Sequence, residues 1–375
     1  MSAIQVRDLR KTFATKRKAA GLRGSLAALW RPAHDTVQAV DDIGFDMEPG
    51  ELLGLIGPNG AGKSTTIKIL TGILHPTSGE VRVLGLVPWQ ARRDLAYRIG
   101  TVFGQRPQLW YHLPAIDTFH LFGKIYEIDD ERVRQRIDAL ADAFDIRHLL
   151  LTPVRKLSLG QRMRCEVAAS LLHAPRLLLL DEPSIGLDVV AKQRIRDTIR
   201  RMNAEEGVGV LLTSHDAGDI ESLCKRVIIV NHGRIVYHDK VSTLKRQFLT
   251  SKRVEVRYAE SMPDGFTVDG AEILKVGKGG YGVKLAFDTR LTPVEAVVAR
   301  LAAAGTLVDM TIEDPTLEEV IRAIYESVPP GAVPDAAGVA PDPGPAATAD
   351  PSSSPAVPMA SSAASPAPGT PGSAP

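Results

Sequence analysis

The residues best suited to chemistry form a glycine-rich loop at 57–65, between an apolar run at 52–56 and a helix-forming run at 66–71. The loop fits G-x-x-x-x-G-K-[ST], in which glycines let backbone N–H groups close around phosphate oxygens. We predict that Lys63 reaches the β- and γ-phosphates of a nucleotide and that Ser64 holds Mg²⁺. The alternative is an ordinary glycine-rich turn. The predicted phosphate-binding residues are Gly57, Pro58, Asn59, Gly60, Ala61, Gly62, Lys63, Ser64 and Thr65.

Two acids follow one of the most apolar runs in the chain. Residues 177–180 are all leucine, and Asp181 and Glu182 come directly after them. Such a run is typical of a parallel strand buried on both faces, and its carboxyl end faces the crevice where α/β sheets bind ligands. We expect Asp181 to hold Mg²⁺ and Glu182 to act as general base on the attacking water. The alternative is that both acids cap the next helix.

Two polar side chains follow other predicted strands. Gln105 comes just after the short apolar run 99–103, where its amide oxygen can reach Mg²⁺ or the attacking water. Taken alone, a glutamine at a strand end is a weak signal. His215 comes directly after the apolar run 208–214 and is placed to touch a γ-phosphate, although a lone histidine after a strand is usually structural.

A serine–glycine pair opens another predicted helix. Ser158, Gly160 and Gln161 precede a helical run that continues to about residue 173, and a helix N-terminus attracts anions. Plain N-capping by Ser158 is the alternative. Phe13, upstream of the glycine-rich loop, is placed either to stack on a base or to pack as an ordinary core residue.

The composition indicates a protein with a substantial core. Its 375 residues are 44% hydrophobic. The chain has 45 Lys+Arg and 44 Asp+Glu, so no overall basic excess favours nucleic-acid binding; a local basic patch is the alternative left open. The two cysteines suit a reducing compartment. We see no signal peptide and no apolar run of about 18 residues that would span a bilayer, so any membrane role would need a partner.

The order of the elements predicts an α/β chain with an accessory domain and a tail. The helix predicted over 189–203 has a basic face that we expect to be solvated, formed by Arg194, Arg196, Arg200 and Arg201. The composition of the last segment predicts disorder, because Pro, Ala, Ser and Gly cannot bury enough apolar surface. The predicted parts are a main domain at 1–240, a basic insertion at 14–37, a helical insertion at about 106–173, a small α+β domain at 241–328 and a tail at 329–375.

Taken together, these motifs resemble the ATP-binding subunit of ATP-binding cassette (ABC) transporters. In that family's order they are the Walker A loop at 57–65, the Q-loop residue Gln105, the signature at 157–161, the Walker B strand at 177–182 and the switch histidine His215. Residues 186–188 match its D-loop. The resemblance covers about residues 1–240 and implies a P-loop NTPase cassette with a RecA-like core, an antiparallel β subdomain and a helical subdomain.

The resemblance also implies a mechanism that needs two chains. ATP and Mg²⁺ bind between one chain's Walker A loop and the signature (Ser158, Gly160, Gln161) of a second subunit, most simply in a homodimer. Phe13 occupies the place of the adenine-stacking aromatic. Leu159 stands where the signature usually has its first glycine, and we expect it to slow closure or turnover.

The predicted small domain resembles the C-terminal unit of ABC-2-type drug-exporter ATPases, and residues 103–110 with the basic insertion resemble the viologen-exporter branch. This implies an ATPase on the cytoplasmic face of the cell membrane that drives ABC-2-type permease subunits, with no nucleic-acid partner. An importer ATPase remains the alternative, because both share these motifs. A translation factor would need two cassettes, and a DNA-associated ATPase would need a long coiled coil; neither pattern occurs.

Overall fold

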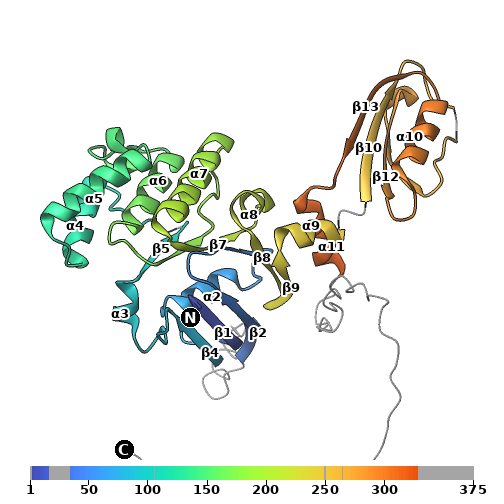
Figure 1. Ribbon diagram of the computed structural model, residues 1–375. Helices are drawn as coiled ribbons and strands as arrows, with labels where there is room; N and C mark the ends of the chain where they lie inside the picture. The colour runs from blue at the N-terminus through green and yellow to red at the C-terminus, as the bar shows by residue number, and fades with distance from the viewer. Residues whose placement is uncertain (1, 17–33, 105, 249–250, 264, 328–375) are drawn as a thin grey trace, which may run out of the picture. The chain divides into compact units, whose positions relative to one another are not determined.

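A computed structural model describes residues 2–16, 34–104, 106–248, 251–263 and 265–327. Three sheets organise these residues (Figure 1): one of six strands, one of three and one of four. The mixed α/β character agrees with the prediction from the sequence. Residues 17–33, Gln105 and the predicted tail lie outside the described residues.

The six-stranded sheet forms the base of the candidate site. Its order is β5-β6-β7-β3-β8-β9; neighbours are parallel except for the pair β8 and β9, which is antiparallel. The four leucines of β6 are fully buried, as the apolar run predicts. The strands are β3 (Leu52–Ile56), β5 (Ile99–Phe103), β6 (Leu177–Asp181), β7 (Gly209–Ser214), β8 (Arg226–Asn231) and β9 (Arg234–Lys240).

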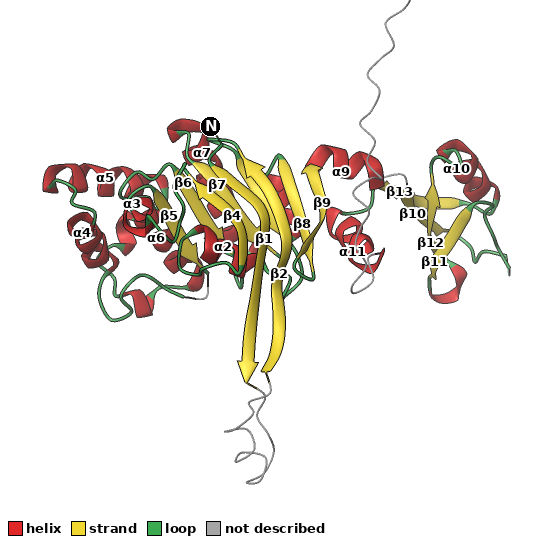
Figure 2. Cartoon of the chain, turned by 90° about the horizontal axis from the view of Figure 1, so that it is seen from below, coloured by secondary structure: helices red, strands yellow, loops and turns green. Residues whose placement is uncertain are grey.

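A three-stranded antiparallel sheet shares a core with β3. Its order is β2-β1-β4, from β1 (Ile4–Lys16), β2 (His34–Met47) and β4 (Ser78–Val83). Figure 2 shows β1 and β2 running side by side as a long pair. The predicted basic insertion at 14–37 is therefore wrong at both ends. Residues 14–16 pair with residues 34–36. The backbone hydrogen bonds between β1 and β2 continue into these mostly polar residues, which the apolar pattern of the sequence did not assign to a strand.

Helices cover the six-stranded sheet and build a subdomain beside β5. Figure 1 shows α4, α5 and α6 grouped next to this edge strand. Their shared core includes Phe119 and Phe144, and Asp129 caps α5 by accepting from the backbone N–H groups of Glu131 and Arg132. The helices are α2 (Lys63–Leu70), α3 (Arg92–Ala96), α4 (Ala115–Ile125), α5 (Asp130–Ala143), η1 (Arg147–Leu149), η2 (Val154–Lys156), α6 (Leu159–Ser170), α7 (Val189–Glu206) and α8 (Ala217–Leu223).

The four-stranded antiparallel sheet has a core of its own. Its order is β11-β12-β10-β13, and α10 packs on it through Val297 and Leu301, which are buried with Val254 and Leu285. No residue of this cluster belongs to the clusters around the larger sheet. The elements are β10 (Ser251–Tyr258), β11 (Ala271–Val276), η3 (Lys278–Gly280), β12 (Gly282–Asp288), α10 (Val294–Ala303) and β13 (Leu307–Glu313).

Two helices within the range that we predicted for the small domain pack elsewhere. Val241 and Leu244 of α9 (Val241–Phe248) and Leu317 and Ile321 of α11 (Leu317–Ser327) belong to the core cluster that contains α6, α7 and α8. Their apolar faces fit that larger core, whereas the small cluster comes from 254–301. The predicted boundary at 241–328 therefore includes two helices whose buried side chains belong to the main core.

The basic face of α7 is not simply solvated. Arg196 pairs with the buried Asp219 of α8, and Arg201 donates to the carbonyl oxygen of Ala143. Arg200 donates to the carbonyl oxygen of Ser222 at 2.8 Å, and Arg194 lies 3.8 Å from Asp145. Arg194, Arg200 and Arg201 are nevertheless exposed, as predicted, and Arg196 is the exception, because the spacing of charges along one helix does not reveal what packs against them.

Candidate active site

The glycine-rich loop joins the end of β3 to the start of α2, as predicted. Gly62 is the N-cap of α2 and has a left-handed backbone with φ of 103°. A Cβ on Gly62 would lie 2.4 Å from the carbonyl oxygen of Ala39, and one on Gly57 would lie 2.4 Å from that of Val230. Both positions therefore need glycine for the loop to approach its neighbours.

The Lys63 side chain lies inside this loop and is only 5% exposed. Its Nζ donates to the carbonyl oxygens of Gly57 at 2.7 Å and Pro58 at 3.3 Å. The same ammonium is 3.4 Å from Oε1 of Glu182. A buried charge needs such partners, and here they hold it at the end of the parallel sheet, where an anionic ligand would meet it.

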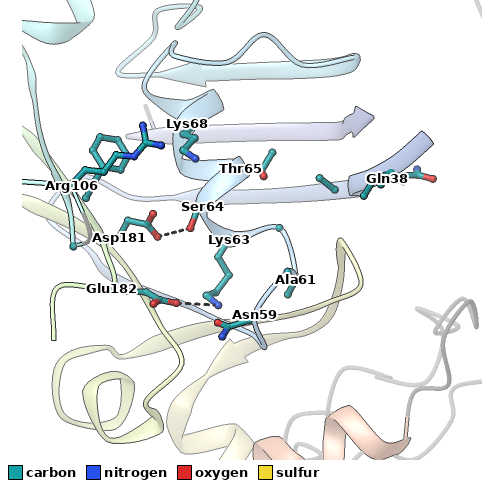
Figure 3. A pocket seen from close by; sticks show the side chains of 16 residues that line it. Gln38, Asn59, Ala61, Lys63, Ser64, Thr65, Lys68, Arg106, Asp181 and Glu182 are labelled. Carbon is teal, nitrogen blue, oxygen red and sulfur yellow. Dashed lines mark hydrogen bonds and ion pairs between the residues drawn. The ribbon is translucent and has the colours of Figure 1, made fainter. Parts of the chain in front are cut away.

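An open pocket of about 590 Å³ surrounds the loop (Figure 3). It lies at the carboxyl ends of β3 and β6, the edge where α/β sheets bind ligands. β2 forms a further wall. The lining residues are Val37, Gln38, Ala39, Asn59, Gly60, Ala61, Gly62, Lys63, Ser64, Thr65, Lys68, Phe103, Gly104, Arg106, Asp181 and Glu182.

The Asp181 carboxylate accepts hydrogen bonds from two hydroxyl groups. Ser64 donates to its Oδ1 at 3.0 Å and Thr213 donates to the same atom at 2.7 Å. Figure 3 shows the Ser64 hydroxyl pointing at the Asp181 carboxylate. A hydroxyl and a carboxylate oxygen are ligands that Mg²⁺ accepts beside phosphate and water. No cluster of three or more His, Cys, Asp or Glu side chains suits a metal in the described part of the chain, so an all-protein cage is not formed there.

Glu182 sits at a strained position directly after β6. Its φ is 54°, a left-handed value that is unfavourable for a residue with a side chain. Its backbone N–H donates to both the carbonyl oxygen and the hydroxyl of Thr213 at 3.1 Å. Its Oε2 lies 3.5 Å from Nδ1 of His215, while its Oε1 faces Lys63. The structure thus brings together Lys63, Ser64, Asp181, Glu182 and His215.

The signature residues do not join this pocket. Ser158 caps α6: its Oγ accepts from the N–H of Gln161 at 3.2 Å, and Oε1 of Gln161 accepts from the N–H of Ser158 at 2.9 Å. Ser158 is therefore the predicted N-cap of α6, and its role as a signature residue stays a prediction. Position 160 has no room for a side chain, since a Cβ on Gly160 would lie 2.8 Å from the Cβ of Ala191.

The signature helix begins against the D-loop. A Cβ on Gly186, where φ is 71°, would lie 3.0 Å from Cδ2 of Leu159. Asp188 ends this loop and caps α7 by accepting from the N–H of Ala191 at 2.8 Å. Leu159 therefore covers the D-loop while remaining 37% exposed.

Gln105 and Phe13 are not placed in the pocket, and its lining also lacks the predicted Gly57, Pro58 and His215. Gln105 lies outside the described residues, between the described Gly104 and Arg106. Phe13 pairs in register with Val37, which lines the pocket, but Phe13 itself does not. It is 38% exposed, and Nζ of Lys11 lies 5.1 Å from its ring centroid.

Sequence reasoning missed Thr213 and the basic residues Lys68 and Arg106. Thr213 and Ser214 are hydroxyl residues at the end of an apolar strand, which is a usable signal. Its contact with Asp181 crosses from β7 to β6, and no spacing in the chain predicts that pairing. Lys68 and Arg106 line the pocket and add positive charge beside Lys63.

The fold and the phosphate loop define a P-loop nucleotide-binding protein. Residues 40–185 match the family model described as ABC transporter. The chain is 30% identical over 208 residues to the ABC transporter ATP-binding protein NatA of Bacillus subtilis (strain 168), covering 56% of this chain and 84% of that protein. It is also 30% identical over 286 residues to the daunorubicin resistance ATP-binding protein DrrA3 of Streptomyces coeruleorubidus. That match covers 76% of this chain and 90% of DrrA3.

A solved structure agrees on the fold. The dimeric post-hydrolysis structure of the ATP-binding cassette MJ0796 with ADP and Pi has a TM-score of 0.54 and 23% identity, and the match covers 64% of this chain and 98% of that one. The chain belongs to the ATP-binding proteins of ABC transporters and is an ATPase subunit that binds nucleotide. Within the described residues, no helix is both long and apolar enough to cross a lipid bilayer.

Proposed function

We propose that this ATPase drives an ABC-2-type exporter for drugs or other xenobiotics. The observation that carries this proposal is the extent of the match to DrrA3, a protein named for daunorubicin resistance, which covers 76% of this chain. A match of this length reaches beyond the six-stranded core. An importer ATPase is the second candidate, because the motifs around the phosphate loop serve both directions of transport.

The catalytic roles follow from the contacts of the pocket. Lys63 binds the β- and γ-phosphates, which replace the carbonyl oxygens of Gly57 and Pro58 as its partners. Glu182 takes the proton of the attacking water. His215 contacts the γ-phosphate and the Glu182 carboxylate, and it keeps the two in position relative to each other. Gln105 is assigned to the same water and metal, and Phe13 to the adenine ring.

Ser64 and Asp181 are the residues that would hold Mg²⁺. The ion supplies charge neutralisation between the β- and γ-phosphates when it is bound. Thr213 keeps the Asp181 carboxylate in position through its 2.7 Å hydrogen bond. The three oxygen-bearing side chains come from α2, β6 and β7 and converge at one edge of the sheet.

We assign the signature to the site of a second copy, in a homodimer. Ser158 caps α6, Gly160 and Gln161 lie in its first turn, and none of them lines the pocket of its own chain. The neighbouring Val189 and Val190, at the start of α7, are 82% and 63% exposed. Apolar side chains beside the D-loop suit a surface that becomes buried when two subunits close on ATP.

Membrane permease subunits are the proposed partners, which places the protein on the cytoplasmic face of the cell membrane. Four large apolar side chains near the helical subdomain are exposed: Trp110, Tyr111, Leu113 and Leu151. The segments that carry them lie together, since the N–H of Arg155 donates to the carbonyl oxygen of Tyr111 at 2.9 Å. A patch of this kind is typical of a protein-binding surface.

A pull-down from native membranes tests the proposal. The tagged full chain is recovered in detergent, and bound integral-membrane proteins are identified by mass spectrometry. Recovery of a six-span permease without a solute-binding protein supports export. A solute-binding protein in the same complex supports import, and ribosomal or DNA-associated proteins would remove the transport assignment. A Trp110→Ala and Leu151→Ala double variant should lose the permease, whereas Leu291→Ala, at an exposed leucine of the small domain, should retain it.

A further inference from the structure

A second cavity opens at the opposite edge of the parallel sheet. Its volume is about 600 Å³, close to that of the phosphate-loop pocket. Gly50, Arg176 and Val208 line it, and they come just before β3, β6 and β7. The phosphate-loop pocket lies at the carboxyl ends of β3 and β6, so one strand length of roughly 16 Å separates the two.

The lining of this cavity is apolar with a positive rim. Two guanidinium groups, of Arg82 and Arg176, border it, and neither makes a side-chain hydrogen bond or ion pair with any residue that the structure describes. The one carboxylate in the lining, Glu206, is held by Arg136 through hydrogen bonds of 2.9 and 2.6 Å. The apolar lining side chains are Ala3, Pro49, Leu84, Ala174, Pro175 and Val208.

The walls of the cavity are fixed by backbone and side-chain hydrogen bonds. Asn203 Nδ2 donates to the carbonyl oxygens of Gly50 at 2.8 Å and Val208 at 2.7 Å. The N–H of Leu84 donates to the carbonyl oxygen of Ala3 at 2.7 Å. The cavity is therefore preformed and does not depend on loop closure, and its volume is within the usual range for small-molecule sites.

Two lining residues have unfavourable backbones. Leu84 has φ of 50° and Ala174 has φ of 52°, left-handed values that residues with a side chain adopt rarely. Glu182 is another such residue, and it lies in the phosphate-loop pocket. Five other described non-glycine residues with positive φ, among them Asp8 and His232, line neither pocket, so these backbones show only that the wall is held by its surroundings.

We propose that this cavity binds an amphipathic organic anion, with an apolar body seated on the six apolar side chains and one acidic group between Arg82 and Arg176. A guanidinium binds carboxylate, sulfonate and phosphate oxygens alike, so the class is defined by one such group on an apolar molecule. An occupant would contact both the antiparallel sheet and the amino ends of the parallel strands, and it would stabilise their packing. The site is separate from nucleotide binding.

The probe that tests this is 1-anilinonaphthalene-8-sulfonate, an apolar ring system with one sulfonate whose fluorescence rises on binding. Titration of the full chain should show one saturable site that a non-hydrolysable ATP analogue does not displace, and sodium decanoate should compete for it. The Arg82→Met and Arg176→Met double variant should weaken binding at least about tenfold, because the charge-assisted hydrogen bonds to the sulfonate are lost.

The control is the Arg92→Met and Arg132→Met double variant, which removes the same charge from exposed positions of α3 and α5. It should bind the probe within about twofold of the wild type, since neither residue lines the cavity. Equal weakening in both double variants would overturn the proposal, as would displacement of the probe by the ATP analogue.

A second variant tests the cavity itself. Gln5 lines it and lies directly opposite Arg82 in the β1–β4 ladder, so Gln5→Trp places a large ring in the cavity without changing charge. The saturable site should disappear in this variant, while Gln5→Ser should keep it, and circular dichroism would verify that both are folded. Persistence of the site in Gln5→Trp would show that the probe binds elsewhere and would reject the proposal.

Discussion

Arg196 of α7 donates to the carboxylate of Asp219 of α8 through Nε at 2.8 Å and Nη2 at 2.5 Å. Asp219 is only 2% exposed, and its other oxygen accepts from the hydroxyls of Ser214, at 2.9 Å, and Ser184. Ser214 precedes His215, and Ser184 comes two residues after Glu182. One buried carboxylate therefore holds the backbone on both sides of the gap between Glu182 and His215.

Replacing Asp219 with Asn should lower kcat more than it raises KM for ATP. The amide cannot keep both serine hydroxyls and Arg196, so Glu182 and His215 lose their alignment while the phosphate loop stays intact. We expect kcat to fall about tenfold or more with KM within about threefold. Chemical denaturation should show a loss of about 3 kcal/mol, since the partly buried Arg196 then keeps only its longer, 4.0 Å pair with Asp216.

Asp197→Asn is the matched control for that variant. Asp197 also pairs on α7, with Arg200 at 2.8 Å, but this pair is exposed. Its removal should leave kcat and stability nearly unchanged. If kcat fell equally in Asp219→Asn and Asp197→Asn, with the same KM for ATP in both, Asp219 would have no special positioning role.

Glu182→Gln should keep ATP binding while hydrolysis falls at least about a hundredfold. The amide cannot accept a proton, whereas Lys63, Ser64 and Asp181 remain. Size-exclusion chromatography with ATP and Mg²⁺ should then show a stable dimer that the wild type forms only transiently. Turnover close to that of the wild type would remove Glu182 from its proposed role.

Leu159→Gly should raise turnover by about threefold, a change well under 1.4 kcal/mol in the barrier. Leu159 covers Gly186 of the D-loop, and removing its side chain frees the surface where we place the second subunit. Steady-state ATPase assays at several protein concentrations would measure this. Leu159→Met retains the bulk and should behave like the wild type; unchanged or lower turnover in the glycine variant would contradict the expectation.

His173 should make the protein less stable as the pH falls through the range of its ordinary pKa. Burial lowers the pKa of His173, its Nε2 lies 3.0 Å from the carbonyl oxygen of Ile99, and its buried Nδ1 has no hydrogen-bond partner among the residues that the structure describes. The ring also stacks on Tyr126 with centroids 3.9 Å apart. The unfolded chain therefore takes up the proton more readily, and the stability present above the unfolded pKa is lost as the pH falls.

Thermal unfolding at pH 7.5 and pH 5.5 measures this effect by comparison with His173→Gln. The wild type should lose more stability between these values than the variant does, because the variant has no imidazole to protonate. His148→Gln, at an exposed histidine of η1, should lose as much as the wild type. An equal loss in the wild type and in His173→Gln would show that His173 does not contribute.

Much of the site was predictable because its parts are local in sequence. The glycine pattern at 57–65 fixes a strand, a loop and a helix, and the leucines at 177–180 fix a buried strand that ends in two acids. Ser158 was recognisable as a helix cap for the same reason. Each of these predictions depends on neighbours within a few residues.

The contacts that the sequence did not reveal join distant segments. Thr213 reaches Asp181 from the next strand, and Arg196 reaches Asp219 from a different helix. α11 packs with α8 although the small sheet lies between them in the sequence. Periodicity shows which face of an element is apolar or charged, but it does not identify the partner of that face.

Both cysteines of the chain are buried, and neither forms a disulfide. Burial raises the pKa of the Cys165 thiol to about 12 and raises that of Cys224 as well, so neither forms the nucleophilic thiolate near neutral pH. A cysteine introduced at the exposed Val190 would therefore react with a maleimide dye far faster than the native thiols. The native protein thus already provides a nearly silent background for site-specific fluorescent labelling, through which the approach of two subunits can be followed in real time.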